Sequence, residues 1–177
     1  EPITNYQMSN VRDHVGVVLQ DTYLFSGTVR ENIRFGKLDA TDAEVEEAAK
    51  IAYAHNFIKY LPEHYETVLT SGGMNLSQGQ RQLIAIARAI LEDPDILILD
   101  EATSSVDTMT EVHIQKGLNN LMKGRTSFVI AHRLKTIETA DQILVMKDGQ
   151  IFEKGNHETL MQADGFYASL QKQLLAN

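Results

Sequence analysis

The stretch Leu76–Asp107, which reads LSQGQRQLIAIARAILEDPDILILDEATSSVD, constrains the fold more than any other part of the chain. Ser77 and Gln80 have the S/T-x-x-E/Q spacing of a capping box, and apolar residues follow at close to helical spacing. The pattern predicts a helix that starts at Ser77. Asp93-Pro94 is expected to stop this helix, because the residue before a proline is driven out of the helical conformation.

The next run, Ile96–Leu99, is short and wholly apolar, as expected for a strand buried on both faces of a parallel sheet. Asp100 and Glu101 follow at its C-terminal end. Open α/β sheets bind ligands at that edge, and two adjacent acids there can hold Mg²⁺ and activate a water for attack on a phosphate. Taken singly, however, two acids after a strand are often only a solvated turn, and a serine at a helix start is usually only a cap.

Two further apolar runs predict buried strands, and each of them ends at a polar residue. Val15–Leu19 is followed by Gln20, and Arg125–Ala131 is followed by His132. A polar side chain in such a place can touch a bound metal or an attacking water. A glutamine that merely ends a strand and a histidine with a structural role are nevertheless the commoner cases.

Local signals outline the remaining elements. Thr28 with Glu31 and Thr41 with Glu44 form capping boxes, and the second of these predicts a helix over Asp39–Leu61. The other expected elements are a loop region over 62–75, helices over 108–122 and 166–175, a β-hairpin around Asp148-Gly149 and a helix capped by Asn156.

The combination of LSQGQ, the later ILILDEATSSVD and Ala131-His132-Arg133 at the end of another strand resembles the nucleotide-binding domain of ABC transporters, especially of exporters. The resemblance runs through essentially the whole chain. It implies an α/β fold with a partial P-loop NTPase (RecA-like) core, a parallel sheet and the α-helical subdomain of ABC proteins. Residues 1–27 would hold a core strand and the Q-loop, 28–92 the helical subdomain with the signature motif, and 93–177 the C-terminal half of the ATP-binding core.

The resemblance also implies roles for particular residues. Glu101 would be the general base that orients the attacking water, and His132 would hold the γ-phosphate of ATP. Asp100 and Gln20 would serve Mg²⁺ and the water. The remaining implied nucleotide contacts are Ser77, Gln78, Gly79 and Gln80 of the signature motif, together with Asp107 of the D-loop at the dimer interface.

The implied partners are a transmembrane domain, on the same chain or on a partner chain, and a second nucleotide-binding domain. This places the domain at the cytoplasmic face of the cell membrane. Gln78 stands where the commonest signature has glycine, and Gly72-Gly73-Met74-Asn75 stands where many exporters carry an acidic residue. The first departure suggests a weaker site and a different subunit as partner, so both a homodimer and a heterodimer remain open.

The phosphate-cradling pattern G-x-x-x-x-G-K-[ST] is absent from the sequence. In the family this loop lies upstream of the Q-loop strand, so the chain is expected to be a C-terminal piece of a nucleotide-binding domain. We therefore expect the isolated chain to bind ATP poorly and to show no ATPase activity. Apolar strand faces are expected to be exposed, which would favour self-association.

Composition limits the alternatives. The net charge of −8 and the pI of about 5.2 give no basic footprint for nucleic acid, and no apolar run approaches the roughly 18 residues that cross a bilayer. The acidic balance and the exporter-like segment Gly27–Ile33 argue against an ABC ATPase without a membrane partner that acts on DNA or ribosomes. A non-catalytic fragment that only binds a partner domain is the third interpretation.

Overall fold

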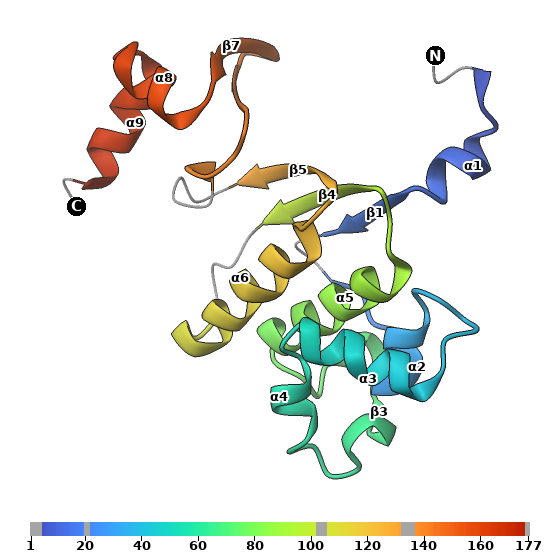
Figure 1. The fold of residues 1–177 in the computed structure, drawn as a ribbon. Helices are drawn as coiled ribbons and strands as arrows, with labels where there is room; N and C mark the ends of the chain where they lie inside the picture. Colours follow the sequence, from blue (N-terminus) through green and yellow to red (C-terminus); the bar gives the residue numbers. More distant parts are fainter. Residues whose placement is uncertain (1–4, 20–21, 102–105, 132–136, 176–177) are drawn as a thin grey trace. The chain divides into compact units, whose positions relative to one another are not determined.

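The computed structural model describes residues 5–19, 22–101, 106–131 and 137–175 (Figure 1). These residues divide into two compact units, Glu1–Ile130 and Ala131–Asn177, which are described separately. Within the described residues, no helix combines the length and apolarity that crossing a membrane requires.

A three-stranded sheet forms the centre of the first unit. Its strands are β1 (Val15–Val18), β4 (Ile96–Glu101) and β5 (Thr126–Ala131), in the order β1-β4-β5. β1 and β4 are parallel, with Val18 opposite Leu99. β5 starts at the same edge, because the amide of Thr126 donates to the carbonyl of Asp95 just before β4. The structure thus confirms the predicted mixed α/β fold with a parallel sheet.

The burial of these strands differs from the prediction. Leu97 and Leu99 are buried, but the side chains that alternate with them are not. Val17 is 50% exposed, Ile98 36% and Phe128 59%. Figure 1 shows why one face is exposed: among the described residues, the helices α5 and α6 lie along only one face of the sheet. The prediction that β4 is buried on both faces was wrong. The expected exposure of apolar strand faces is confirmed.

Helix α5 (Gln78–Glu92) follows the prediction closely. The Ser77 hydroxyl accepts from the Gln80 amide (3.2 Å), and the Gln80 side chain accepts from the Ser77 amide (3.0 Å). Leu83, Ile84, Ile86 and Ala87 form its buried face. The helix ends at Asp93, which has the left-handed φ of 54° that terminates a helix just before Pro94.

Helix α6 (Thr108–Met122) packs against α5 and has the predicted bounds. The short helix α1 (Met8–Arg12) precedes the sheet. Helix α2 (Val29–Arg34) begins at the predicted capping box of Thr28 and Glu31. Just before it, β2 (Gly27–Thr28) pairs with β3 (Val68–Leu69) in antiparallel fashion. The region predicted as loop therefore contains a strand, along with the 3-10 turns η2 (His64–Glu66) and η3 (Ser71–Gly73).

The single helix predicted over Asp39–Leu61 is wrong. The chain forms α3 (Asp42–Ile51) and α4 (His55–Ile58), with a break at Tyr53, whose φ is 63°. At the break, the carbonyl of Ile51 accepts a hydrogen bond from the side chain of Asn120 on α6 (3.0 Å). A contact from a distant helix therefore satisfies a carbonyl that a continuous helix would have bonded internally.

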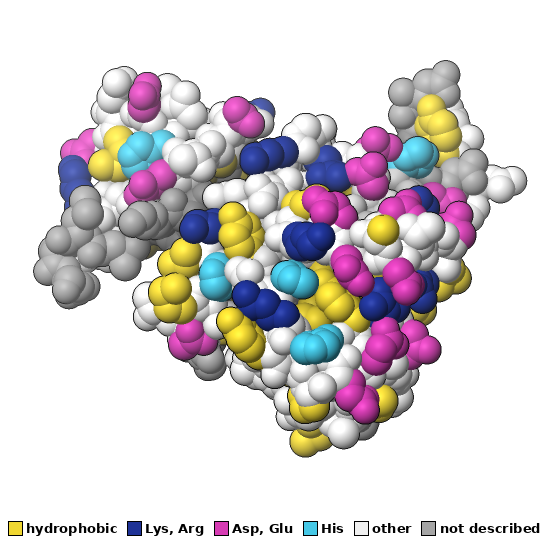
Figure 2. Space-filling view, turned by 60° about the horizontal axis from the view of Figure 1, so that its bottom comes forward, with side chains coloured by type: hydrophobic (Ala, Val, Ile, Leu, Met, Phe, Trp, Pro, Cys, Tyr) yellow, Lys and Arg dark blue, Asp and Glu magenta, His cyan; other side chains and the backbone are white. Residues whose placement is uncertain are grey.

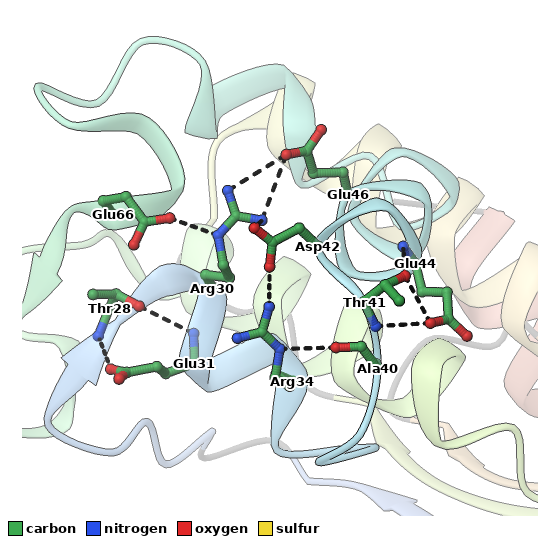
Figure 3. A network of polar contacts seen from close by, with 10 residues as sticks. All are labelled: Thr28, Arg30, Glu31, Arg34, Ala40, Thr41, Asp42, Glu44, Glu46 and Glu66. Atoms are coloured by element: carbon green, nitrogen blue, oxygen red, sulfur yellow. Dashed lines mark hydrogen bonds and ion pairs between the residues drawn. The ribbon is translucent and has the colours of Figure 1, made fainter.

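Ion pairs tie α2 to α3 and η2 (Figure 3). Arg30 pairs with Glu66 (2.5 Å), Glu46 (3.4 Å) and Asp42 (3.6 Å), and Arg34 also pairs with Asp42. Burial lowers the pKa of the Arg30 guanidinium, but the surrounding carboxylates outweigh it and raise the pKa above its ordinary value. The charges are thus mutually compensated, which holds these short elements together.

In the second unit, β6 (Ile143–Lys147) and β7 (Gln150–Gly155) form the predicted hairpin. Asp148 and Gly149 make its turn with φ values of 50° and 75°, as a two-residue turn of this kind requires. Helix α8 (His157–Gln162) has the predicted Asn156 cap, and α9 (Phe166–Leu175) follows. Ile143, Leu160 and Tyr167 form the buried core of this unit.

Candidate functional site

The N-terminus of α5 carries the residues of the predicted signature motif. The capping box uses the Ser77 hydroxyl as an acceptor, so its O–H can still donate to a ligand. The amides of Gln78 and Gly79 lie in the first turn, where no intrahelical acceptor exists. These donors and the positive end of the helix dipole form an arrangement that suits the oxygens of a phosphate.

Gly79 fixes where this helix end lies. It is buried, and a Cβ added to it would lie 2.4 Å from Cγ2 of Thr110 and 2.8 Å from Cγ1 of Val106. Only a residue without a side chain allows the start of α5 to approach the start of α6 so closely. The structure therefore brings the signature residues together with the segment that contains Asp107.

Asp107 itself caps α6, a role that the sequence analysis missed. Its carboxylate accepts from the amide of Thr110 (2.9 Å), and this hydrogen bond lowers the pKa of the carboxyl below its ordinary value. The signal was available, because aspartate is a preferred N-cap residue and the predicted helix started at the next position. The cap orients Asp107 at the same junction that Gly79 keeps narrow.

The second group of predicted site residues lies at the edge of the sheet. Asp100 and Glu101 are the last two residues of β4, and Asp100 is partly buried. Because Val18 pairs with Leu99 in parallel, β1 and β4 end at the same edge. The predicted residues Gln20 and His132 lie outside the described residues, as does the side chain of Glu101.

Three aromatic residues form an exposed cluster that the sequence analysis did not assign to a site. We call Tyr23, Phe25 and Phe35 the aromatic patch. Tyr23 meets Phe25 edge-on with ring centroids 5.5 Å apart, and Phe25 lies 4.5 Å from Phe35. Their exposed fractions are 65%, 40% and 56%. The signal for this patch was the aromatic run that starts three residues after Gln20.

The charges on the helical part of the first unit are mixed. In Figure 2, Lys and Arg side chains are interspersed with Asp and Glu on the face drawn. Arg30, Arg34 and Lys37 each have a carboxylate partner. Because these positive charges are paired and the net charge of the chain is −8, this face offers little attraction for a polyanion such as nucleic acid.

The fold and the two groups of residues define a class of protein: an α/β domain with a helix N-terminus suited to phosphate oxygens and an acidic sheet edge. A family model described as "ABC transporter" matches residues 1–104, more than half of the 177 residues. The chain belongs to the ABC transporter family.

Relatives narrow the family assignment. An uncharacterized ABC transporter ATP-binding protein of Bacillus subtilis, YfiC, is 60% identical over 162 residues, or 92% of this chain and 27% of that protein. The ATP-dependent lipid A-core flippase of Acinetobacter baylyi is 52% identical over 172 residues, or 97% of this chain and 30% of that protein. The chain thus spans less than a third of the length of these relatives.

A solved structure agrees with this assignment. The structure of a bacterial Atm1-family ABC exporter with ATP bound matches 99% of this chain and 31% of that chain, with a TM-score of 0.90 and 40% identity. The fold and the sequence together identify an ATP-binding domain of the exporter-type branch of the family.

Proposed function

We propose that this chain contributes two parts of an ATP site in an exporter, a phosphate-binding helix end and an acidic sheet edge. The observation that carries the proposal is the start of α5, where the exposed Ser77 keeps an O–H that can donate and the first-turn amides of Gln78 and Gly79 have no intrahelical acceptor. Gly79 holds this end against α6 without a side chain of its own. A phosphate bound there would be held mainly by backbone and hydroxyl donors.

At the sheet edge, we assign the chemistry to acidic and polar side chains. Glu101 would orient the attacking water as general base, and His132 would contact the γ-phosphate. A carboxylate such as Asp100 suits Mg²⁺, which binds one or two carboxylates besides water and phosphate, and Gln20 would complete this set. When bound, Mg²⁺ would neutralise phosphate charge.

Residues 28–92 would form the helical subdomain and dock on a transmembrane partner. A relative from Bacillus subtilis is described as a putative multidrug export ATP-binding/permease protein and is 52% identical over 168 residues. The aromatic patch supplies a contact surface of the right kind, because exposed neighbouring aromatic residues are typical of interface centres. Such a partner would place the domain at the cytoplasmic face of a membrane.

A second nucleotide-binding domain would complete each ATP site, with Asp107 near the interface. Gln78 replaces the glycine of the commonest signature and is partly buried beside the phosphate-binding donors. Its side chain fills space that glycine leaves open, which supports a weakened site and a heterodimer. The alternative is a homodimer with two such sites.

The proposal is tested by ATP hydrolysis. Residues 1–177 contain no G-x-x-x-x-G-K-[ST] segment, so we expect this chain alone to be inactive. The same chain should hydrolyse ATP when it is fused to the segment of a relative that contains the G-x-x-x-x-G-K-[ST] loop and lies before the region that matches this chain. Glu101→Gln should abolish that activity, whereas Glu47→Gln, an exposed acid on α3, should leave it intact. Turnover by the chain alone, or full activity of Glu101→Gln, would contradict these assignments.

A further inference from the structure

Arg88 lies on α5, and its guanidinium contacts two other parts of the chain. Nε donates to the carbonyl of Asn32 (2.9 Å), and Nη2 donates to the side-chain oxygen of the same residue (3.3 Å). Nη1 donates to the carbonyl of Tyr23 (3.4 Å). A single side chain therefore joins α5, α2 and the segment that follows Gln20.

Asn32 extends this link. It is only 2% exposed, and every polar atom of its amide is used. Oδ1 also accepts from the amide of Phe25 (2.9 Å), while Nδ2 donates to the carbonyls of Phe25 and Thr28 (both 3.0 Å). A buried network in which every member has its partners is rigid, and one lost donor leaves buried acceptors without a partner.

Arg88 also lies against the aromatic patch. Its guanidinium carbon is 5.3 Å from the ring centroid of Phe25 and 5.6 Å from that of Phe35. Next to Phe35, a Cβ added to Gly36 would lie 2.2 Å from the carbonyl oxygen of Arg88, so the two backbones are in direct contact. Burial lowers the pKa of the guanidinium from its ordinary value, as expected for a cation enclosed by these groups.

We propose that Arg88 is a positioning residue that makes the aromatic patch, α2 and α5 move as one body. A partner that displaces the patch would then also displace the phosphate-binding start of α5 at Ser77. This inference rests on the proposed function, which places a partner at the patch and a phosphate at Ser77. Arginine suits the role because its rigid guanidinium spreads its donors over three nitrogens and so reaches acceptors on separate segments, whereas the three donors of lysine all sit on one nitrogen.

The first test is amide hydrogen exchange on residues 1–177 without nucleotide. Arg88→Lys keeps the charge but loses the fork, so amides of residues 23–36 should exchange about ten-fold faster or more, the factor expected when a buried acceptor loses its donor. Amides of α6 should be unchanged. Arg34→Lys is the matched control, because it is the same substitution at an arginine of α2 that contacts Ala40 and Asp42 and not Tyr23 or Asn32. Uniform acceleration throughout the first unit, or none at 23–36, would overturn the proposal.

The second test asks whether a disturbance of the patch is transmitted. Phe35→Ala removes an exposed ring, and in the wild-type background it should raise exchange in α5 several-fold. In the Arg88→Lys background, the same change should leave α5 unaffected. Equal effects in both backgrounds would show that Arg88 is merely structural. Since no nucleotide is present, a failure here is independent of whether ATP binds, which the hydrolysis assay decides separately.

Discussion

Gly79→Ala tests the contact that places the N-terminal end of α5, the proposed phosphate-binding end, against α6. The added Cβ would lie 2.4 Å from Thr110 and 2.8 Å from Val106, well inside van der Waals contact. Both neighbours are β-branched and stiff at χ1, so neither can turn away cheaply. Overpacking of this kind costs about 1–3 kcal/mol. Replacing glycine in a helix returns at most about 1 kcal/mol. We therefore expect a net loss of stability of about 1–2 kcal/mol.

The assay is urea unfolding of residues 1–177 followed by circular dichroism, with the slope checked for constancy between variants. For a chain of this size the loss corresponds to a fall in Tm of about 2–8 °C. Thr110→Ser removes the methyl group that the new Cβ meets first but keeps the amide that Asp107 caps. In the double variant, this change should recover about half of the loss.

Two results would refute the reasoning about Gly79. One is a Gly79→Ala variant as stable as the wild type, because the contact with α6 would then yield at no cost. The other is strict additivity of Gly79→Ala and Thr110→Ser, since residues in steric conflict should show a coupling free energy of about 0.5 kcal/mol or more.

The remaining predictions concern titration and the open sheet face. The backbone amide of Thr41 is the largest cause that lowers the pKa of Glu44 to about 2, from 4.5. Its folded pKa is the lower one, so its stabilisation is complete above pH 4.5 and is lost as the pH falls through about 2. Amide exchange in α3 should rise over that window, and Glu44→Gln should remove the pH dependence. Burial raises the pKa of Tyr65 to about 12, from 10.0, so stability should decline as the pH rises from 10.0 through about 12. Absorbance titration should show a late phenol ionisation that is missing in Tyr65→Phe. Finally, the exposed Phe128 and Ile130 should drive concentration-dependent self-association in light scattering, which Phe128→Glu should reduce. A wild-type chain that stays monomeric at every concentration would count against that role.

Features encoded within a few residues were predictable from the sequence. The capping boxes at Thr28, Thr41 and Ser77 each need only two residues three positions apart, and the structure has all three. The break at Tyr53 was not predictable, because the side chain that bonds to the end of α3 belongs to Asn120, 69 positions later. The same limit applied to burial: an apolar run predicts a strand, but what covers its two faces depends on distant elements.

The candidate site shows the same division. Its motif identified Ser77 as a cap and hence as a helix end with free donors, because capping is local. The need for a glycine at position 79 could not be predicted, because it comes from close contact with the methyl groups of Val106 and Thr110 on a later segment. Arg88 was hidden as well, because its acceptors are on Tyr23 and Asn32, far away in the sequence.

Gly79 and Arg88 together suggest how α5 works. They are nine positions apart, about two and a half helical turns, so they face opposite sides of the helix. On one side, Gly79 lies against α6 near Asp107. On the other side, Arg88 donates a hydrogen bond to Asn32 of α2 and contacts the aromatic patch. If α5 moves as one body, as we propose, a displacement on the Arg88 side also alters the fit at Gly79. Gly79 lies next to Ser77 and Gln78, which carry the other proposed phosphate-binding donors.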